Sequence, residues 1–395
     1  MPVDRQVPVP HSFGMIDPPL RSRITGLSSF DFHRVLDGRS WNPSWRWRER
    51  RVPLVHVVTE DGRIGVGEGW SDDNDTAPFH ARFALVAPLL LGADASLIEA
   101  NHATLWSDAH WSDAAVASAI DIALWDLHAK SLDAALYVLP GACRHAAPVY
   151  ASGGLYADDE GPDELATEMR RYVALGFPAV KLKIGALPMA DDIARVAAVR
   201  DAVGSNVAII VDALGLLTRG TASAWLEQLA AQRVRAIQAP LPVDDIDGLV
   251  SLQRSGGLTV IAGEGEFRHD VLHRLVRQSA VGMLQINAGL CGGITGALKL
   301  IACATAAGIS VTTQCHGTAV LQAASLHLGA ARRAVSLVEF HMFHTHLHSA
   351  LPPGMQLPRD GCMDLDERPG LGIDDGVFAP SDDVDGTVSP AVTIG

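Results

Sequence analysis

Lysine is scarce in this chain of 395 residues, because nearly all of its cationic side chains are arginines. Four lysines occur, at Lys130, Lys181, Lys183 and Lys299. Half of them therefore lie in one short segment, 180–185 (VKLKIG), whose other residues are mostly apolar. An exposed edge strand with two solubilising charges is one interpretation. The apolar neighbours and the scarcity of lysine elsewhere favour a buried strand that carries a functional pair.

Long apolar runs, CxxC motifs and an excess of positive charge are also missing. No segment holds 18 consecutive apolar residues and the first residues lack a secretory signal pattern, so neither a membrane span nor export is predicted. Five scattered cysteines, an odd number, suit reduced thiols in a cytoplasm. The formal net charge of −14 argues against nucleic acid or an anionic membrane as partner, yet a local cationic site remains compatible with an anionic small molecule.

The lysine pair predicts proton-transfer chemistry. Lys181 and Lys183 are two residues apart, so both side chains leave the same face of a strand. Arginine keeps its proton in proteins, whereas lysine loses its proton when it is desolvated or crowded by another cation. Two adjacent ammonium groups in a poorly solvated site should lower the pKa of one of them, which yields a base near neutral pH.

The first part of the chain predicts a proline-rich arm (1–16) and then an α+β domain (17–145). Alternating segments at 23–34 and 51–60 predict strands, and residues 79–139 turn helical, with a buried helix over 114–132.

The loop between these strands is rich in tryptophan and arginine. These residues are Arg39, Trp41, Trp45, Arg46, Trp47, Arg48 and Arg50. Such a mixture could clamp an anionic or aromatic ligand, with Arg46 and Trp47 as our candidates for substrate contact. A solvated loop with its tryptophans packed inward explains the composition equally well.

From residue 146 to 345, apolar strands and helices alternate every 25 to 30 residues. Eight such strands predict a parallel α/β barrel, with a doubly wound sheet as the alternative. The remaining segment, 346–395, is rich in Pro, Gly and Asp and is expected to return to the N-terminal domain. Polar residues end the predicted strands, as in a site at the carboxyl end of a barrel. They are Lys183, Asp212, Gln238, Glu264, Asn287, Gln314 and Glu339.

The spacing of these residues carries a family resemblance. From Lys183 to Gln314 the steps are 29, 26, 26, 23 and 27 residues. With the stretches SAIDIALWDLHAKSL, VKLKIG, IIVDA, AIQAPL, IAGEGE, LQINAGLCGGIT and GISVTTQCHGTA, the chain resembles the enolase superfamily in its mandelate racemase and muconate-lactonizing branch, over roughly residues 20–380. The resemblance implies an N-terminal capping domain on a modified TIM-type (β/α)7β barrel, a homo-oligomer, and an enolate stabilised by Mg²⁺.

Several positions depart from the pattern of that family. The resemblance implies Asp212, Gln238 and Glu264 as metal ligands, but Gln238 replaces a carboxylate, so Mg²⁺ should bind weakly or not at all. Asn287 and Gln314 stand where many members carry an Asp–His base, and neither accepts a proton at neutral pH. We expect these two amides to bind substrate instead.

Three further side chains are candidates in the same region. Glu339 matches a family acid that hydrogen-bonds the substrate carboxylate, and His341 shares its strand face. His316 is either a replacement for the lost second base or a hydrogen-bonded loop residue. The run HMFHTHLH adds His344, His346 and His348, which form either a metal cluster or a polar rim.

These observations predict a lyase or isomerase. Lys183 would take up or deliver a proton next to the carboxylate of a small organic acid, with Lys181 tuning its pKa and touching that carboxylate. The result would be isomerisation, cycloisomerisation or elimination. The alternative is a ligand-binding protein without turnover on a decayed active site.

Overall fold

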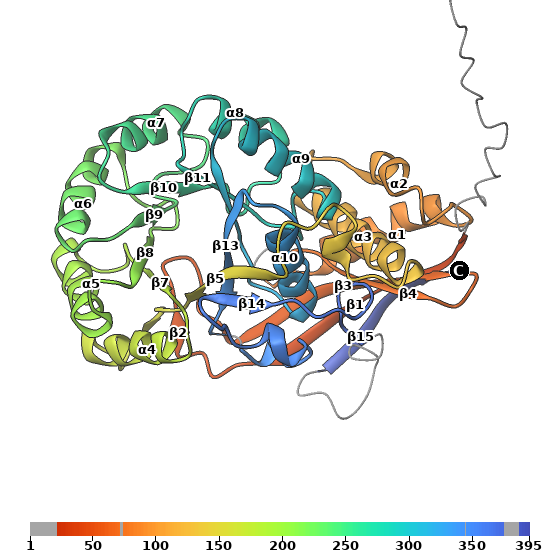
Figure 1. Ribbon diagram of the computed structural model, residues 1–395, viewed down its shortest axis with the longest axis horizontal. Helices are drawn as coiled ribbons and strands as arrows, with labels where there is room; N and C mark the ends of the chain where they lie inside the picture. Colours follow the sequence, from red (N-terminus) through yellow and green to blue (C-terminus); the bar gives the residue numbers. More distant parts are fainter. Residues whose placement is uncertain (1–21, 72–73, 344, 375–386) are drawn as a thin grey trace, which may run out of the picture.

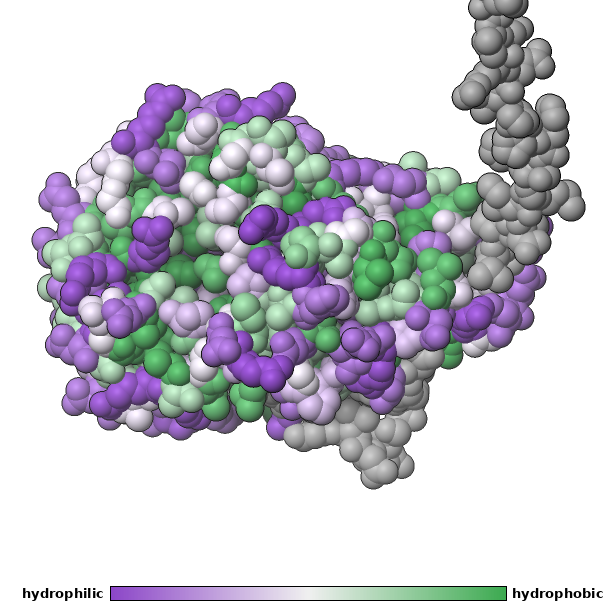
Figure 2. All heavy atoms as spheres, in the orientation of Figure 1, coloured by the Kyte–Doolittle hydropathy of each residue, from purple (hydrophilic) through white to green (hydrophobic). Residues whose placement is uncertain are grey.

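The computed structural model describes residues 22–71, 74–343, 345–374 and 387–395, so the predicted arm at 1–16 lies outside it. An antiparallel sheet with helices lies beside a ring of strands and helices (Figure 1). On the face shown in Figure 2, hydrophilic and hydrophobic residues are interspersed over both parts. Within the described ranges, no helix combines the length and apolar character needed to span a membrane.

The N-terminal sheet has the strand order β15-β1-β3-β4. Its strands are β1 (Ile24–Val35), β3 (Glu49–Thr59), β4 (Ile64–Glu68) and β15 (Thr387–Ile394). The helices of this domain are α1 (Ala77–Val86), α2 (Ile98–Leu105) and α3 (Trp111–Ser131), with the short η1 (Ala87–Leu90) after α1 and η2 (Leu136–Val138) after α3. The antiparallel pairing of β15 with β1 brings the end of the chain back to this sheet.

The barrel has eight parallel strands and is closed by pairing between its first and last strands. In order around the barrel they are β5 (Ala146–Ser152), β7 (Ala179–Lys183), β8 (Ala208–Asp212), β9 (Ala236–Gln238), β10 (Thr259–Ala262), β11 (Met283–Ile286), β12 (Ser310–Thr313) and β13 (Val335–His341). Closure confirms the predicted barrel. The doubly wound alternative is wrong, because an open sheet would not pair β13 with β5.

Seven helices connect the eight strands, which gives the predicted (β/α)7β pattern. They are α4 (Pro162–Ala174), α5 (Met189–Val203), α6 (Arg219–Ala231), α7 (Ile246–Ser255), α8 (His269–Arg277), α9 (Gly293–Ala306) and α10 (Ala319–Ala331). The remaining short elements are β2 (Ser40–Trp41), β6 (Tyr156–Ala157), η3 (Thr345–His348), η4 (Pro353–Met355) and β14 (Cys362–Asp364).

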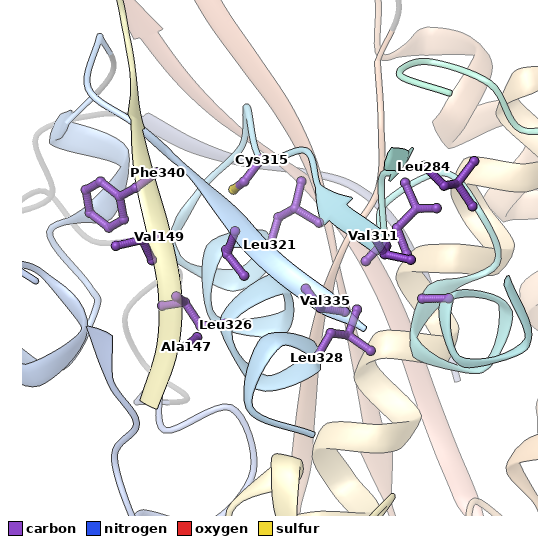
Figure 3. Close-up of a cluster of buried hydrophobic side chains, with 14 of the residues drawn as sticks. Ala147, Val149, Leu284, Val311, Cys315, Leu321, Leu326, Leu328, Val335 and Phe340 are labelled. Carbon is purple, nitrogen blue, oxygen red and sulfur yellow. The ribbon is translucent and has the colours of Figure 1, made fainter. Parts of the chain in front are cut away.

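Helix α10 is buried along its whole length, unlike a helix that covers a barrel on one side only. Figure 3 shows Leu321 and Leu326 of α10 toward Val149 of β5, and Leu328 of the same helix beside Val335 of β13. Helix α10 also contacts β4 and η2 of the N-terminal domain. The two domains therefore share one apolar core around this helix.

The N-terminal sheet approaches α3 very closely at β4. A Cβ atom at Gly67 would overlap the backbone carbonyl of Ala119. Gly67→Ala should therefore lower the free energy of unfolding by about 3 kcal/mol, since backbone cannot move aside as a flexible side chain does. Urea unfolding followed by circular dichroism measures this change. Gly220→Ala in α6, where a Cβ atom has ample room, is the matched control. Equal stability of the two variants would contradict the expectation.

Candidate active site

Consecutive barrel strands bring the predicted site residues to one end. Lys183, Asp212 and Gln238 are the last residues of β7, β8 and β9, and register pairs Lys183 with Asp212 and Asp212 with Gln238. Glu264 follows β10 by two residues. Because the strands are parallel, all four side chains lie at the carboxyl end of the barrel.

Lys181 is fully enclosed and its ammonium group has three acceptors. Its Nζ lies 2.8 Å from Gln238 Oε1, 2.8 Å from Glu339 Oε1 and 3.5 Å from Asp212 Oδ2. Burial disfavours the charged form, but Glu339 and the other nearby acidic groups outweigh burial and hold the pKa of Lys181 well above its ordinary value. Carboxylates surround Lys181, so they and not repulsion from Lys183 determine the direction of its pKa shift.

Lys183 lies two residues further along β7 and reaches the site cavity. Its ammonium group forms an ion pair with Asp212. Burial alone would raise the pKa of Asp212, but Lys183 and Lys181 outweigh it and lower that pKa. Lys183 is thus the member of the pair that a bound molecule can touch.

The carboxamide of Gln238 lies between Lys181 on one side and the carboxyl groups of Asp212 and Glu264 on the other. Its oxygen accepts hydrogen bonds from Lys181 and, at 3.3 Å, from Gln285 Nε2. Its nitrogen donates to Asp212 Oδ2 at 2.9 Å and also to Glu264. Gln238 therefore presents N–H groups to the two carboxylates.

A second run of amides reaches Glu264 from the opposite side. The backbone N–H of Gly289 donates to Asn287 Oδ1 at 2.8 Å, and Asn287 Nδ2 donates to Gln314 Oε1 at 2.8 Å. Gln314 Nε2 in turn donates to Glu264 Oε1 at 2.7 Å. Burial and the charge of Asp212 raise the pKa of Glu264 to about 7.

A cavity of about 110 Å³ lies over these residues. Lys183, Glu264 and Gln314 line it from the barrel side. The loop before β3 covers it with Arg46 and Trp47. Glu339, His316 and His341 line the cavity as well, so the structure brings most of the predicted side chains to one space.

The enclosed residues Asn287 and Lys181 support the cavity from behind. Each contacts a lining residue, since Asn287 binds Gln314 and Lys181 binds Glu339. Both residues therefore lie behind side chains that line the cavity, and their contact with substrate stays a prediction.

The histidines of the site form an aromatic group on the side of the covering loop. The rings of His316 and His341 lie 4.5 Å apart, and Trp47 meets His316 edge-on at 5.7 Å. Burial lowers the pKa of His341 well below its usual range. His348 is buried against Phe340, while His344 and the side chain of His346 lie outside the described residues.

Sequence reasoning did not single out Gln285 and gave Arg50 only as part of a loop. Gln285 precedes Asn287 by two residues, so the period of a strand was a signal that both face the barrel interior. Arg50 is buried and donates to the carbonyl oxygen of His316 and to Asn74 Oδ1 at 3.1 Å. It therefore ties the covering loop to the loop after β12.

The donor set does not fit Mg²⁺. This ion takes oxygen ligands in near-octahedral geometry, and only carboxylate, carbonyl or water oxygens serve well. Between Asp212 and Glu264 the structure places an amide N–H group, and the amide oxygen of Gln238 is turned toward Lys181. Within the described ranges, no cluster of three or more His, Cys, Asp or Glu residues is arranged to hold a metal ion, and this includes the described part of the histidine run.

Family models match most of the chain. The model described as mandelate racemase / muconate lactonizing enzyme, N-terminal domain, matches residues 46–141, and the model described as enolase C-terminal domain-like matches residues 164–374. The chain belongs to the enolase superfamily, in its mandelate racemase and muconate-lactonizing branch.

Three relatives within the enolase superfamily illustrate the similarity. Arabinonate dehydratase of Saccharolobus solfataricus is 28% identical over 83% of this chain and 89% of its own. 3,6-anhydro-alpha-L-galactonate cycloisomerase of Streptomyces coelicolor is 30% identical over 81% of this chain and 87% of its own. The crystal structure of L-talarate dehydratase from Polaromonas sp. JS666, in complex with Mg and L-glucarate, is 27% identical with a TM-score of 0.80, covering 95% of this chain and 99% of that one.

These relatives place the chain among the lyases and isomerases of the enolase superfamily. The magnesium in the L-talarate dehydratase crystal belongs to that protein. The amide at Gln238 distinguishes the present site from a set of three carboxylates.

Proposed function

We infer that Lys183 transfers a proton to or from the carbon next to the carboxylate of a small hydroxy acid. The observation that carries this proposal is the difference between the two lysines. Lys183 lines the cavity, whereas Lys181 is enclosed, donates to Gln238 and pairs with Glu339 and Asp212. A proton carrier must come within hydrogen-bond reach of the reacting carbon, and of the two lysines Lys183 is the one that lines the cavity.

The chemistry of the cavity supports an anionic, hydroxylated substrate. Arg46 from the covering loop and Arg50 from β3 bring positive charge to the cavity. Arg46 is held by Asp158 at 2.9 Å and by the carbonyl oxygen of Gly38 at 3.1 Å. We propose that Arg46 binds the substrate carboxylate and that Trp47 packs on the carbon chain. The names of the relatives, which include arabinonate and anhydrogalactonate, point to sugar acids.

The Glu339 and Gln314 side chains suit the hydroxyl groups of such an acid. Glu339 Oε1 pairs with Lys181, so this carboxyl group is held in place while it lines the cavity. A carboxylate accepts a hydrogen bond from a hydroxyl group, and the fixed orientation of Gln314 adds a second polar contact. Substrate orientation would then place its C2–H bond toward Lys183.

Exchange of the C2 proton in D₂O tests the proposal. Arabinonate and a panel of related sugar acids are incubated with the protein, and loss of the C2 proton signal is followed by NMR. We expect at least one acid to exchange, and its uncharged amide to remain unlabelled, because the amide lacks the charge that Arg46 recognises. Exchange of the amide at the same rate would contradict the role given to the carboxylate.

A ligand-binding protein without turnover is the second candidate. The observation that favours it is the set of amides Gln238, Asn287 and Gln314 at positions where the resemblance implies acids or bases. Saturable binding of a sugar acid by calorimetry, with no exchange and no product for any acid of the panel, would support this candidate and overturn the proposed reaction.

A further inference from the structure

We propose that the Gln238 carboxamide takes the place of the divalent cation in this site, so that Asp212 and Glu264 are held together by hydrogen bonds and the protein does not bind Mg²⁺ there. The proposal describes the site without bound substrate, and it follows from the direction of the hydrogen bonds that Gln238 and Gln314 make.

The direction of the Gln238 amide is fixed by its neighbours. A lysine ammonium group only donates hydrogen bonds, so Gln238 must turn its oxygen toward Lys181 Nζ, 2.8 Å away. Gln285 Nε2 donates to the same oxygen. The amide nitrogen is consequently directed at Asp212 and Glu264, where it donates to both.

The far side of Glu264 is fixed in the same manner. A backbone N–H group also only donates, so Gly289 sets the oxygen of Asn287, and Asn287 sets the oxygen of Gln314. Gln314 must then direct its nitrogen at Glu264. Two donors with fixed directions therefore converge on Glu264 from Gln238 and Gln314.

Charge favours the same conclusion. In their ionised forms, the two lysines and the carboxylates of Asp212, Glu264 and Glu339 leave one net negative charge. A third ligand carboxylate at position 238 would leave two, which a divalent cation would neutralise. With Gln238 in place, a bound Mg²⁺ would leave a net positive charge in an enclosed site and would displace the N–H donors of the amide.

Binding of Mg²⁺ by the full-length protein, freed of metal with EDTA, tests this proposal. Titration of wild-type protein with MgCl₂ should give no saturable heat in calorimetry and no change in melting temperature. Gln238→Glu should melt at a lower temperature without metal, because three carboxylates then crowd together. Mg²⁺ should restore its stability, with a rise of about 5 °C at a hundredfold excess over Kd.

The double variant Gln238→Glu/Asp212→Asn is the control, and it should lose the response to Mg²⁺. Saturable binding of Mg²⁺ by the wild type, abolished in Asp212→Asn, would overturn the proposal, and this measurement stands even if Gln238→Glu does not fold. Absence of a Mg²⁺ response in folded Gln238→Glu would overturn it too. No substrate enters the experiment, so its failure is distinguishable from failure of the proposed reaction.

Discussion

Lys183→Met should reduce the exchange of the substrate C2 proton in D₂O by about a thousandfold or more, a loss at the scale of a positioned proton carrier. Methionine keeps the unbranched stem, and Asp212 keeps Lys181 and Gln238 as partners, so the barrel should remain folded. The rate of C2 deuteration by NMR, normalised to enzyme with native circular dichroism, measures the effect. Undiminished exchange would remove Lys183 from the reaction.

Lys183→Arg is the matched control for charge. Arginine retains the positive charge and can still pair with Asp212, but it does not release its proton in a protein. We therefore expect this variant to fold and to bind the acid, and to exchange as poorly as Lys183→Met. Substantial exchange in the arginine variant would show that Lys183 contributes charge and does not carry the proton.

Lys181 is unsuitable as a control because its loss has a different consequence. Removing its ammonium group leaves Glu339 without its buried cation and Gln238 without its donor. Breaking such a buried pair costs about 3–5 kcal/mol of stability. Lys181→Met should therefore lower the free energy of unfolding as well as the activity. The same substitution at the exposed Lys299, which pairs with Glu99, is a suitable comparison.

The strands of the barrel were predictable because their apolar segments recur at regular intervals and end in polar residues. The two-residue repeat of a β-strand predicted that Lys181 and Lys183 share a face. It does not say how far each side chain lies from the carboxyl end of the barrel. The two-residue offset encloses Lys181 among acidic groups from other strands and leaves Lys183 at the cavity. Which carboxylates surround a lysine depends on strand register, which sequence does not specify.

The covering loop illustrates a different limit. Its composition was compatible with a ligand clamp and with inward packing of tryptophans, and the structure places one tryptophan at the cavity and another against the rest of the protein. Trp47 lines the cavity, while Trp41 stacks on Tyr156 at 4.9 Å, over a hundred residues away in the chain. The direction of the Gln238 amide was equally inaccessible, since it depends on donors from β7 and β11 and on an acceptor from β8.

The second face of the substrate determines the stereochemical outcome. In the strand order, β11 lies four strands from β7 in either direction, so Asn287 at the end of β11 is across the barrel from Lys183. Asn287 and Gln314 are hydrogen-bonded to each other, and amides exchange no proton with carbon at neutral pH. His316 lines the cavity beside Trp47, which meets its ring edge-on, and beside the tilted ring of His341.

Because inversion at C2 needs proton carriers on both faces, we expect one-sided chemistry. Of two C2 epimers such as arabinonate and ribonate, one should exchange, eliminate or cyclise, and the other should remain unlabelled under the same conditions. Separate incubation of each epimer in D₂O, followed by NMR, measures this. His316→Asn should leave the selectivity unchanged, as asparagine retains polarity without a proton-accepting ring. Interconversion of both epimers by the wild type, lost in His316→Asn, would instead identify His316 as the second base.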